Sequence, residues 1–123
     1  MIRYAVKDWL ETVFKDAVIN VETDNDTNTH GSVTVHYLGG LDTDMQQHLF
    51  RLFFKGKNAD EVLVMGEKLR KNMGNINHQF GAFTLSSVQS TEKHNTRILF
   101  ERGSNGIGQL DVTFYINEDK NNE

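Results

Sequence analysis

The acidic stretch over residues 23–29 is the part of the sequence that most resembles a metal site. Asp24, Asp26 and Asn28 occupy alternate positions, as do the first three oxygen ligands of an EF-hand calcium loop. The rest of that motif is missing, because Thr29 stands where it needs glycine and Val35 stands where it needs a bidentate glutamate. We therefore interpret the stretch as an acidic solvated loop and predict no metal site.

Five histidines are spread along the chain, and their spacing does not suggest a metal site either. They stand at positions 30, 36, 48, 78 and 94. No two have the separation of four that puts a pair on one face of a zinc-binding helix, and none has a glutamate where such motifs need one. His36 and His48 belong to neighbouring expected strands and could face each other there. We interpret all five as core or surface residues.

The residue types of nucleophilic and phosphate-binding sites also lack the right surroundings. Residues 103–108, "GSNGIG", have glycines in the wrong order for a phosphate loop and precede a strand rather than a helix, so they predict a hairpin turn. Ser86, Ser87 and Ser90 lack the context of a nucleophile elbow. The chain has no cysteine, which removes thiolate chemistry. We predict no catalytic residues, no cofactor and no enzymatic activity.

Three phenylalanines leave a different class of function open. Phe50, Phe53 and Phe54 lie close together on one expected strand, where aromatic side chains most often build the core. The same cluster would suit the apolar pocket of a small intracellular ligand-binding α+β domain. That remains an alternative prediction.

The composition limits the remaining classes. A chain of 123 residues is one domain. Its net charge of −4 and pI near 5.7 do not suit a nucleic-acid-binding protein, which usually carries a basic patch. No apolar run approaches the length of a membrane span, and the N-terminus lacks a signal-peptide pattern. We therefore expect folding in the cytosol and no membrane partner.

Hydrophobic periodicity and turn residues predict an α+β fold, with a mostly antiparallel or mixed sheet and two helices packed on it. We expect one domain over 1–117 and a solvated tail over 118–123. Asn58 is expected to cap the second helix, and Gly74 to follow its end with a positive φ. The expected elements are a helix over 2–17, strands over 18–23, 32–38 and 46–55, a helix over 59–73, and strands over 82–89, 96–101 and 109–117.

The strand over 46–55 is expected to organise the fold. After His48 one of its faces is wholly apolar, whereas the other mixes Leu and Phe with Gln and Arg. A strand of this kind is covered on one face and partly covered on the other. We therefore predict a central strand or a strand at an interface.

Three segments together resemble a known family. They are "IRYAVKDWLET" over 2–12, "LFRLFFKGKNADEVLVMGEKLRKNM" over 49–73 and "RILFERGSNGIGQLDVTFYIN" over 97–117. In this order and at this length, the chain resembles the minor-capsid or tail-terminator proteins of long-tailed bacteriophages, which act in tail completion and head–tail joining.

The resemblance implies a structural subunit of the virion without enzymatic activity. Members form a homohexameric ring that caps the finished tail tube, stops its polymerisation and presents a surface to the head connector or stopper protein. DNA passes through the lumen without specific binding. The ring would be assembled in the host cytoplasm and lie at the end of the tail near the head–tail junction. A head-side connector or stopper is a second possibility that the sequence does not separate from the first.

Two groups of residues are candidates for the contacts of such a ring. Glu22, Asp24 and Asp26 are predicted to face the lumen or the tube, where negative charge would repel DNA and keep it mobile. Arg51, Phe53 and Lys55 are predicted to lie at the subunit interface, with the two basic residues facing acidic groups of the adjacent subunit.

Overall fold

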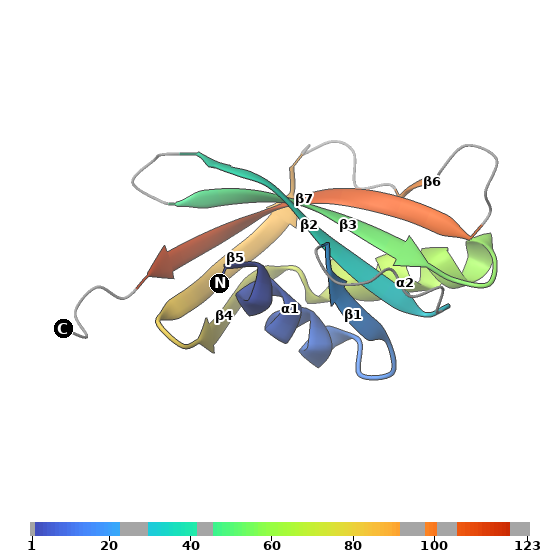
Figure 1. The fold of residues 1–123 in the computed structure, drawn as a ribbon, viewed down its shortest axis with the longest axis horizontal. Helices are drawn as coiled ribbons and strands as arrows, with labels where there is room; N and C mark the ends of the chain where they lie inside the picture. Colours follow the sequence, from blue (N-terminus) through green and yellow to red (C-terminus); the bar gives the residue numbers. More distant parts are fainter. Residues whose placement is uncertain (1, 23–29, 42–45, 92–97, 101–105, 119–123) are drawn as a thin grey trace.

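The computed structural model describes residues 2–22, 30–41, 46–91, 98–100 and 106–118. Within these residues the chain forms two helices and a seven-stranded sheet (Figure 1). In chain order the elements are α1 (Ile2–Val13), β1 (Val18–Val21), β2 (Ser32–Leu41), β3 (Gln47–Lys55), α2 (Ala59–Asn72), β4 (Gly74–Phe80), β5 (Phe83–Ser90), β6 (Leu99–Phe100) and β7 (Ile107–Glu118). The predicted α+β fold is confirmed.

The sheet is mixed, with the strand order β1-β2-β3-β7-β5-β4 and β6 beside β7. β1 and β2 run parallel, and all other paired strands run antiparallel. β7 pairs with β3 along one side and with β6 and then β5 along the other. The strand expected to be central, β3, therefore lies in the middle of the sheet beside β7.

The sheet curls around α1 (Figure 1). This helix contacts β1 and β2 towards one edge of the sheet and β4 and β5 towards the other. Polar contacts accompany both sides: Arg3 Nη1 lies 3.4 Å from the Glu22 carboxylate that follows β1, and His78 Nε2 of β4 lies 2.8 Å from Asp8 Oδ2. α2 packs on β3 and β7 in the middle of the same face. The helix-bearing side is called the inner face below.

Aromatic side chains fill the space between α1 and the inner face. Trp9 meets Phe114 edge to face with ring centroids 5.6 Å apart, and Phe114 meets Phe50 in the same way at 5.4 Å. Phe14 lies edge-on to Phe54 at 6.2 Å. The single tryptophan thus anchors α1 on the sheet. Alternate side chains of β7 are also buried: Leu110, Val112, Phe114 and Ile116.

The first helix ends earlier than the expected 2–17. α1 ends at Val13, and the last helical hydrogen bond runs from the Phe14 N–H to the Leu10 carbonyl at 2.8 Å. The chain then turns, with the Ala17 N–H bonded to the Phe14 carbonyl at 3.4 Å. Ala17 continues the apolar period of the helix, but it belongs to the turn that leads into β1. An apolar residue in phase with a helix does not by itself extend it.

The second helix has the predicted ends. The Asn58 side chain accepts a hydrogen bond of 2.9 Å from the Glu61 N–H, which satisfies one of the free donors of the first turn. Met73 forms the C-cap, and the following Gly74 has φ +107°. Acidic residues occupy the first turn and basic residues the last, as the helix dipole favours.

One strand was not predicted. β4 (Gly74–Phe80) has the sequence "GNINHQF", whose glycine and asparagines have low strand propensity. It forms an edge of the sheet, is mostly exposed, and contains a register shift between Asn75 and His78 around Asn77, which has φ +47°. An edge strand of this kind is held by its neighbour rather than by an apolar pattern of its own.

Other strand ends differ from the prediction by a few residues. β2 continues past the expected residue 38 to Leu41, because a β-bulge between Tyr37 and Gly39 carries the pairing onward. β6 covers residues 99–100, and the rest of the strand expected over 96–101 lies outside the described residues, apart from residue 98. β7 runs to Glu118, which pairs with Phe83, so this residue belongs to the sheet and not to the expected tail. The rest of that tail, residues 119–123, and residues 103–105 of the turn expected over 103–108 also lie outside the described residues, whereas the end of that turn already belongs to β7.

Gly66 marks a close approach between α2 and the segment before β6. A Cβ atom at this position would lie 2.7 Å from Ile98 Cγ1 and 2.8 Å from Ile98 Cδ1, which is closer than such atoms can pack. Gly66 thus allows the close approach of Ile98 to α2. The gain in packing offsets the low helix propensity of glycine.

Replacing Gly66 with alanine is expected to give no net gain in stability, although alanine alone would favour the helix by about 1 kcal/mol. Overpacking against Ile98 costs about 1–3 kcal/mol, which cancels or exceeds that gain in the free energy of unfolding. Chemical denaturation measures it. The Gly66→Ala/Ile98→Ala double variant should lose less free energy of unfolding than the two single variants lose together, because the smaller side chain at position 98 removes the clash. If the two losses simply add, the proposed clash is contradicted.

Candidate functional site

The side of the sheet opposite the helices carries the predicted interface residues. Alternate residues of the central strands point there, and both described helices pack on the inner face instead. Most of these side chains are half-buried. We call this surface the outer face, made of Thr34, His36, Leu49, Arg51, Phe53, Lys55, Gln109, Asp111, Thr113 and Tyr115.

An ion pair lies at the centre of the outer face. Arg51 of β3 and Asp111 of β7 are directly opposite in the antiparallel register. Arg51 Nε donates to Asp111 Oδ1 at 2.8 Å, and Nη2 donates to Oδ2 at 3.1 Å, which is the bidentate geometry of an arginine–carboxylate pair. Hydrogen bonding to Asp111, together with its charge, raises the pKa of Arg51 above its usual value. Arg51 therefore has a partner within its own chain, which the sequence did not reveal.

The β2 end of the outer face is held by a chain of polar and aromatic contacts. The His36 ring lies edge-on to Phe53 with centroids 4.7 Å apart. His36 Nδ1 is 3.1 Å from Glu22 Oε2, and Arg3 approaches the other oxygen of that carboxylate. Glu22, predicted to face a lumen or tube, is thus positioned by α1 and β2. Asp24 and Asp26 lie outside the described residues.

The β5 side of the outer face is also joined to β7 by side chains. Gln89 Nε2 donates to the Tyr115 hydroxyl at 2.7 Å, and the Thr91 and Thr113 hydroxyls lie 3.1 Å apart. The Ser86 hydroxyl donates to the Tyr115 carbonyl at 2.9 Å. These bonds fix the positions of the outer-face side chains before any partner binds.

A histidine and a tyrosine form a separate pair at the end of the sheet. The Tyr37 hydroxyl is 2.8 Å from His48 Nδ1, while His48 Nε2 is buried and has no hydrogen-bond partner among the described residues. A Cβ atom on Gly40 would lie 3.0 Å from that hydroxyl and 3.1 Å from Nδ1, so glycine leaves room for the pair. Burial lowers the pKa of His48 from 6.5, because the charged ring loses solvation.

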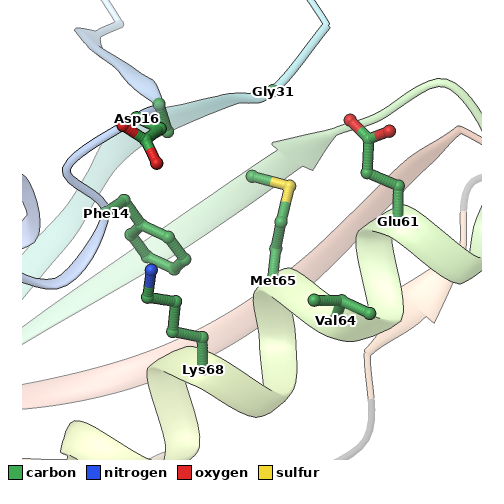
Figure 2. A pocket seen from close by; sticks show the side chains of 8 residues that line it. Phe14, Asp16, Gly31, Glu61, Val64, Met65 and Lys68 are labelled. Atoms are coloured by element: carbon green, nitrogen blue, oxygen red, sulfur yellow. The ribbon is translucent and has the colours of Figure 1, made fainter.

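A hollow opens on the helix-bearing side, between α2 and the turn from α1 to β1 (Figure 2). Its volume of about 210 Å³ is far more than one water molecule needs. In Figure 2 Met65 lies between Phe14 and Glu61, Asp16 lies above Phe14, and the amine of Lys68 lies beside the Phe14 ring. Val64, beside them, is 67% exposed. The lining residues are Phe14, Asp16, Ala17, Gly31, Glu61, Val64, Met65 and Lys68.

The structure separates several residues that the sequence placed together. His36 lies opposite Arg51 and His48 opposite Gly40, so the expectation that the two histidines face each other is wrong. The bulge in β2 and the alternation of strand faces put them on opposite sides of the sheet.

The three phenylalanines do not line one pocket. Phe50 and Phe54 are fully buried on the inner face, and Phe53 lies on the outer face beside His36. The default interpretation as core is confirmed for the first two. The pocket expected from this cluster is not formed, because consecutive strand residues point to opposite faces.

Known proteins do not assign a role to these surfaces. No protein-family model matches the chain, and no curated protein matches it. Among the residues that the structure describes, no group of three or more histidine, aspartate and glutamate side chains is arranged to hold a metal ion. Neither described helix, α1 nor α2, has the length and hydropathy of a membrane span.

The free energy of unfolding is expected to decrease as the pH falls, because His48 takes up a proton more readily in the unfolded chain. The unfolded chain binds a proton near pH 6.5 and the folded protein only at lower pH, so the contribution is complete above about pH 6.5 and is lost as the pH falls through the lowered pKa. The fall in Tm between about pH 7 and pH 5 should be smaller for His48→Gln than for the unchanged protein. Replacement of the exposed His30 by glutamine is the control, and an equal reduction in both variants would contradict the assignment.

Proposed function

We propose that this chain is a structural subunit of a long-tailed bacteriophage, the tail-terminator or head–tail joining protein that forms a homohexameric ring. The ring caps the tail tube, ends its growth and presents a surface to the head connector or stopper protein. It binds no cofactor, catalyses no reaction and lets DNA pass through its lumen without specific binding. It is assembled in the host cytoplasm and lies at the head-proximal end of the tail.

The observation that carries the proposal is the outer face of β3. Leu49 and Phe53 flank Arg51 in the middle of a rigid sheet, and no described helix covers them. Apolar side chains around a central arginine are typical of the core of a protein interface. The three predicted interface residues, Arg51, Phe53 and Lys55, alternate along β3 and belong to that face. This surface supports a subunit that completes its burial by assembly.

The mass in solution tests the ring. Six copies of the 14.1 kDa chain give about 85 kDa, and light scattering should find this species directly or as the protein concentration rises. Arg51→Glu should shift the mass towards the single chain, because it breaks the Asp111 pair and places like charges at the centre of the outer face.

Lys57→Glu is the matched control, since it reverses one charge at an exposed position after β3. It should leave the mass unchanged. If Arg51→Glu forms the same oligomer as the control, the central ion pair is not part of the subunit contact.

The acidic loop gives a second test. Changing Asp24 and Asp26 together to lysine should lower the infectious titre of a phage carrying the change, because a positive loop facing the lumen or tube would hold DNA or fail to join. The Asp24→Asn/Asp26→Asn variant removes the charge without reversing it. Its titre should lie between that of the unchanged phage and that of the lysine variant. An unchanged titre for the lysine variant would reject the role of this loop.

A head-side connector or stopper would use the same outer face, and an assembly assay separates the two. A terminator added to polymerising tail-tube protein should end tube growth at stoichiometric amounts. A connector should leave tube length unchanged and bind to the head vertex instead.

A further inference from the structure

The exposed side of α2 carries two apolar residues near the middle of the helix. Val64 is 67% exposed and Leu63 is 48% exposed, whereas the apolar side chains that α2 turns towards the sheet are buried. Exposed apolar side chains are stabilised when another element covers them and removes them from water. A helix packed along α2 would cover both residues.

Unpaired charges of opposite sign lie on the two sides of this apolar pair. Asp60 and Glu61 belong to the first turn of α2, and Lys68 and Lys71 lie towards its end. Three of the four are exposed and Glu61 is half-buried. None of them forms an ion pair within the described part of the chain. The unpaired charge therefore changes from negative to positive along the helix.

The remaining charges of α2 do not disturb this order, and the spacing places it on one stripe. Glu67 and Arg70 form an ion pair with each other. Asp60, Val64 and Lys68 follow at steps of four residues, so they lie one above another on the same face of the helix. Figure 2 shows the side chains of Val64 and Lys68 projecting from successive turns of α2.

A helix with this order of charge is complementary to a second copy of itself that runs antiparallel. A two-fold axis near Met65, in the middle of α2, sets the first turn of each helix against the last turns of the other. Both carboxylates of one copy then face both unpaired lysines of the other. Val64 lies one residue from the axis, roughly 1.5 Å along the helix. A parallel arrangement would bring like charges together instead.

We propose that two copies of this chain pair through α2, with the helices antiparallel and Val64 of each copy against Val64 of the other. The contact is isologous, so it joins two copies and goes no further. It lies on the helix-bearing side and leaves the outer face open. It does not depend on the proposed ring, and two rings built through their outer faces would be joined by it at about twice the ring mass.

Light scattering on two charge-reversed variants tests the pairing. Two copies of the 14.1 kDa chain give about 28 kDa. Asp60→Lys/Glu61→Lys makes the unpaired charges of α2 all positive, and Lys68→Glu/Lys71→Glu makes them all negative. Each variant alone should pair roughly tenfold more weakly than the unchanged protein. An equimolar mixture should restore pairing, because opposite charges then face each other at both ends of the contact.

The matched control is Glu11→Lys/Glu118→Lys, which changes the net charge as much as the first variant does, at exposed positions outside α2. It should pair as strongly as the unchanged protein. Far-UV circular dichroism verifies that every variant keeps its helices. An equal loss of pairing in the control, or a mixture of folded variants that does not pair, would overturn the proposed contact.

A cysteine at position 64 gives a second test that leaves every charge in place. The chain contains no cysteine, so oxidation of Val64→Cys should link two copies through this position and yield nothing larger. Tyr4→Cys is the control, at a position on α1 that is 39% exposed, and it should stay unlinked. A Val64→Cys protein that stays unlinked, or equal linkage of the two variants, contradicts the α2 pair.

The α2 pair and the ring fail separately in these measurements. A species of about 28 kDa that never grows to the ring mass, with linkage at position 64, would reject the ring and leave the α2 pair standing. A ring mass that does not double and does not respond to the α2 variants would reject the pair and leave the proposed function standing.

Discussion

The packing of Trp9 against Phe114 is the contact on which the rest of the structure depends. A wide sheet needs one face covered, and α1 has only three turns with which to cover it. The strands solve this by curling until both edges reach the same helix. The contacts of Arg3 with Glu22 and of Asp8 with His78 then join α1 to the two sides of the sheet. Without this aromatic contact, the curl of the sheet and the position of its strands relative to α1 would lose their main stabilising interaction.

The small number of helices also explains why no described helix covers the outer face. Both described helices are used on the inner face, and the side chains opposite them are tied to one another across the strands. A surface fixed in this way loses little side-chain entropy when a partner binds. The hollow beside α2 arises for a related reason. α1 ends at Val13, and the chain turns away before it can fill the space next to Met65.

The sequence predicted well wherever one local rule decided the structure. The alternation in β3 and β7 identified the buried face, and the asparagine and glycine that flank α2 identified its ends. It failed where a neighbour decides: β4 is polar and is held by β5, and the bulge in β2 changes which residues face each other. The Arg51–Asp111 pair joins residues 60 positions apart, and opposite charges on two strands reveal a contact only once the strand order is known. The hollow combines α2 with a turn whose position depends on the end of α1, so no local pattern indicates it.

The place of β7 has a consequence for how the protein forms. This strand is the last described strand in the chain, yet it lies in the middle of the sheet and hydrogen-bonds to three others. During synthesis, β3 and β5 leave the ribosome without the strand that belongs between them, and the apolar face of β3 stays open until β7 arrives. Contacts so distant in sequence make folding slow and leave strand edges available to other chains in the meantime. The two parts β1-β2-β3 and β4-β5 therefore become one sheet only after translation has passed residue 118.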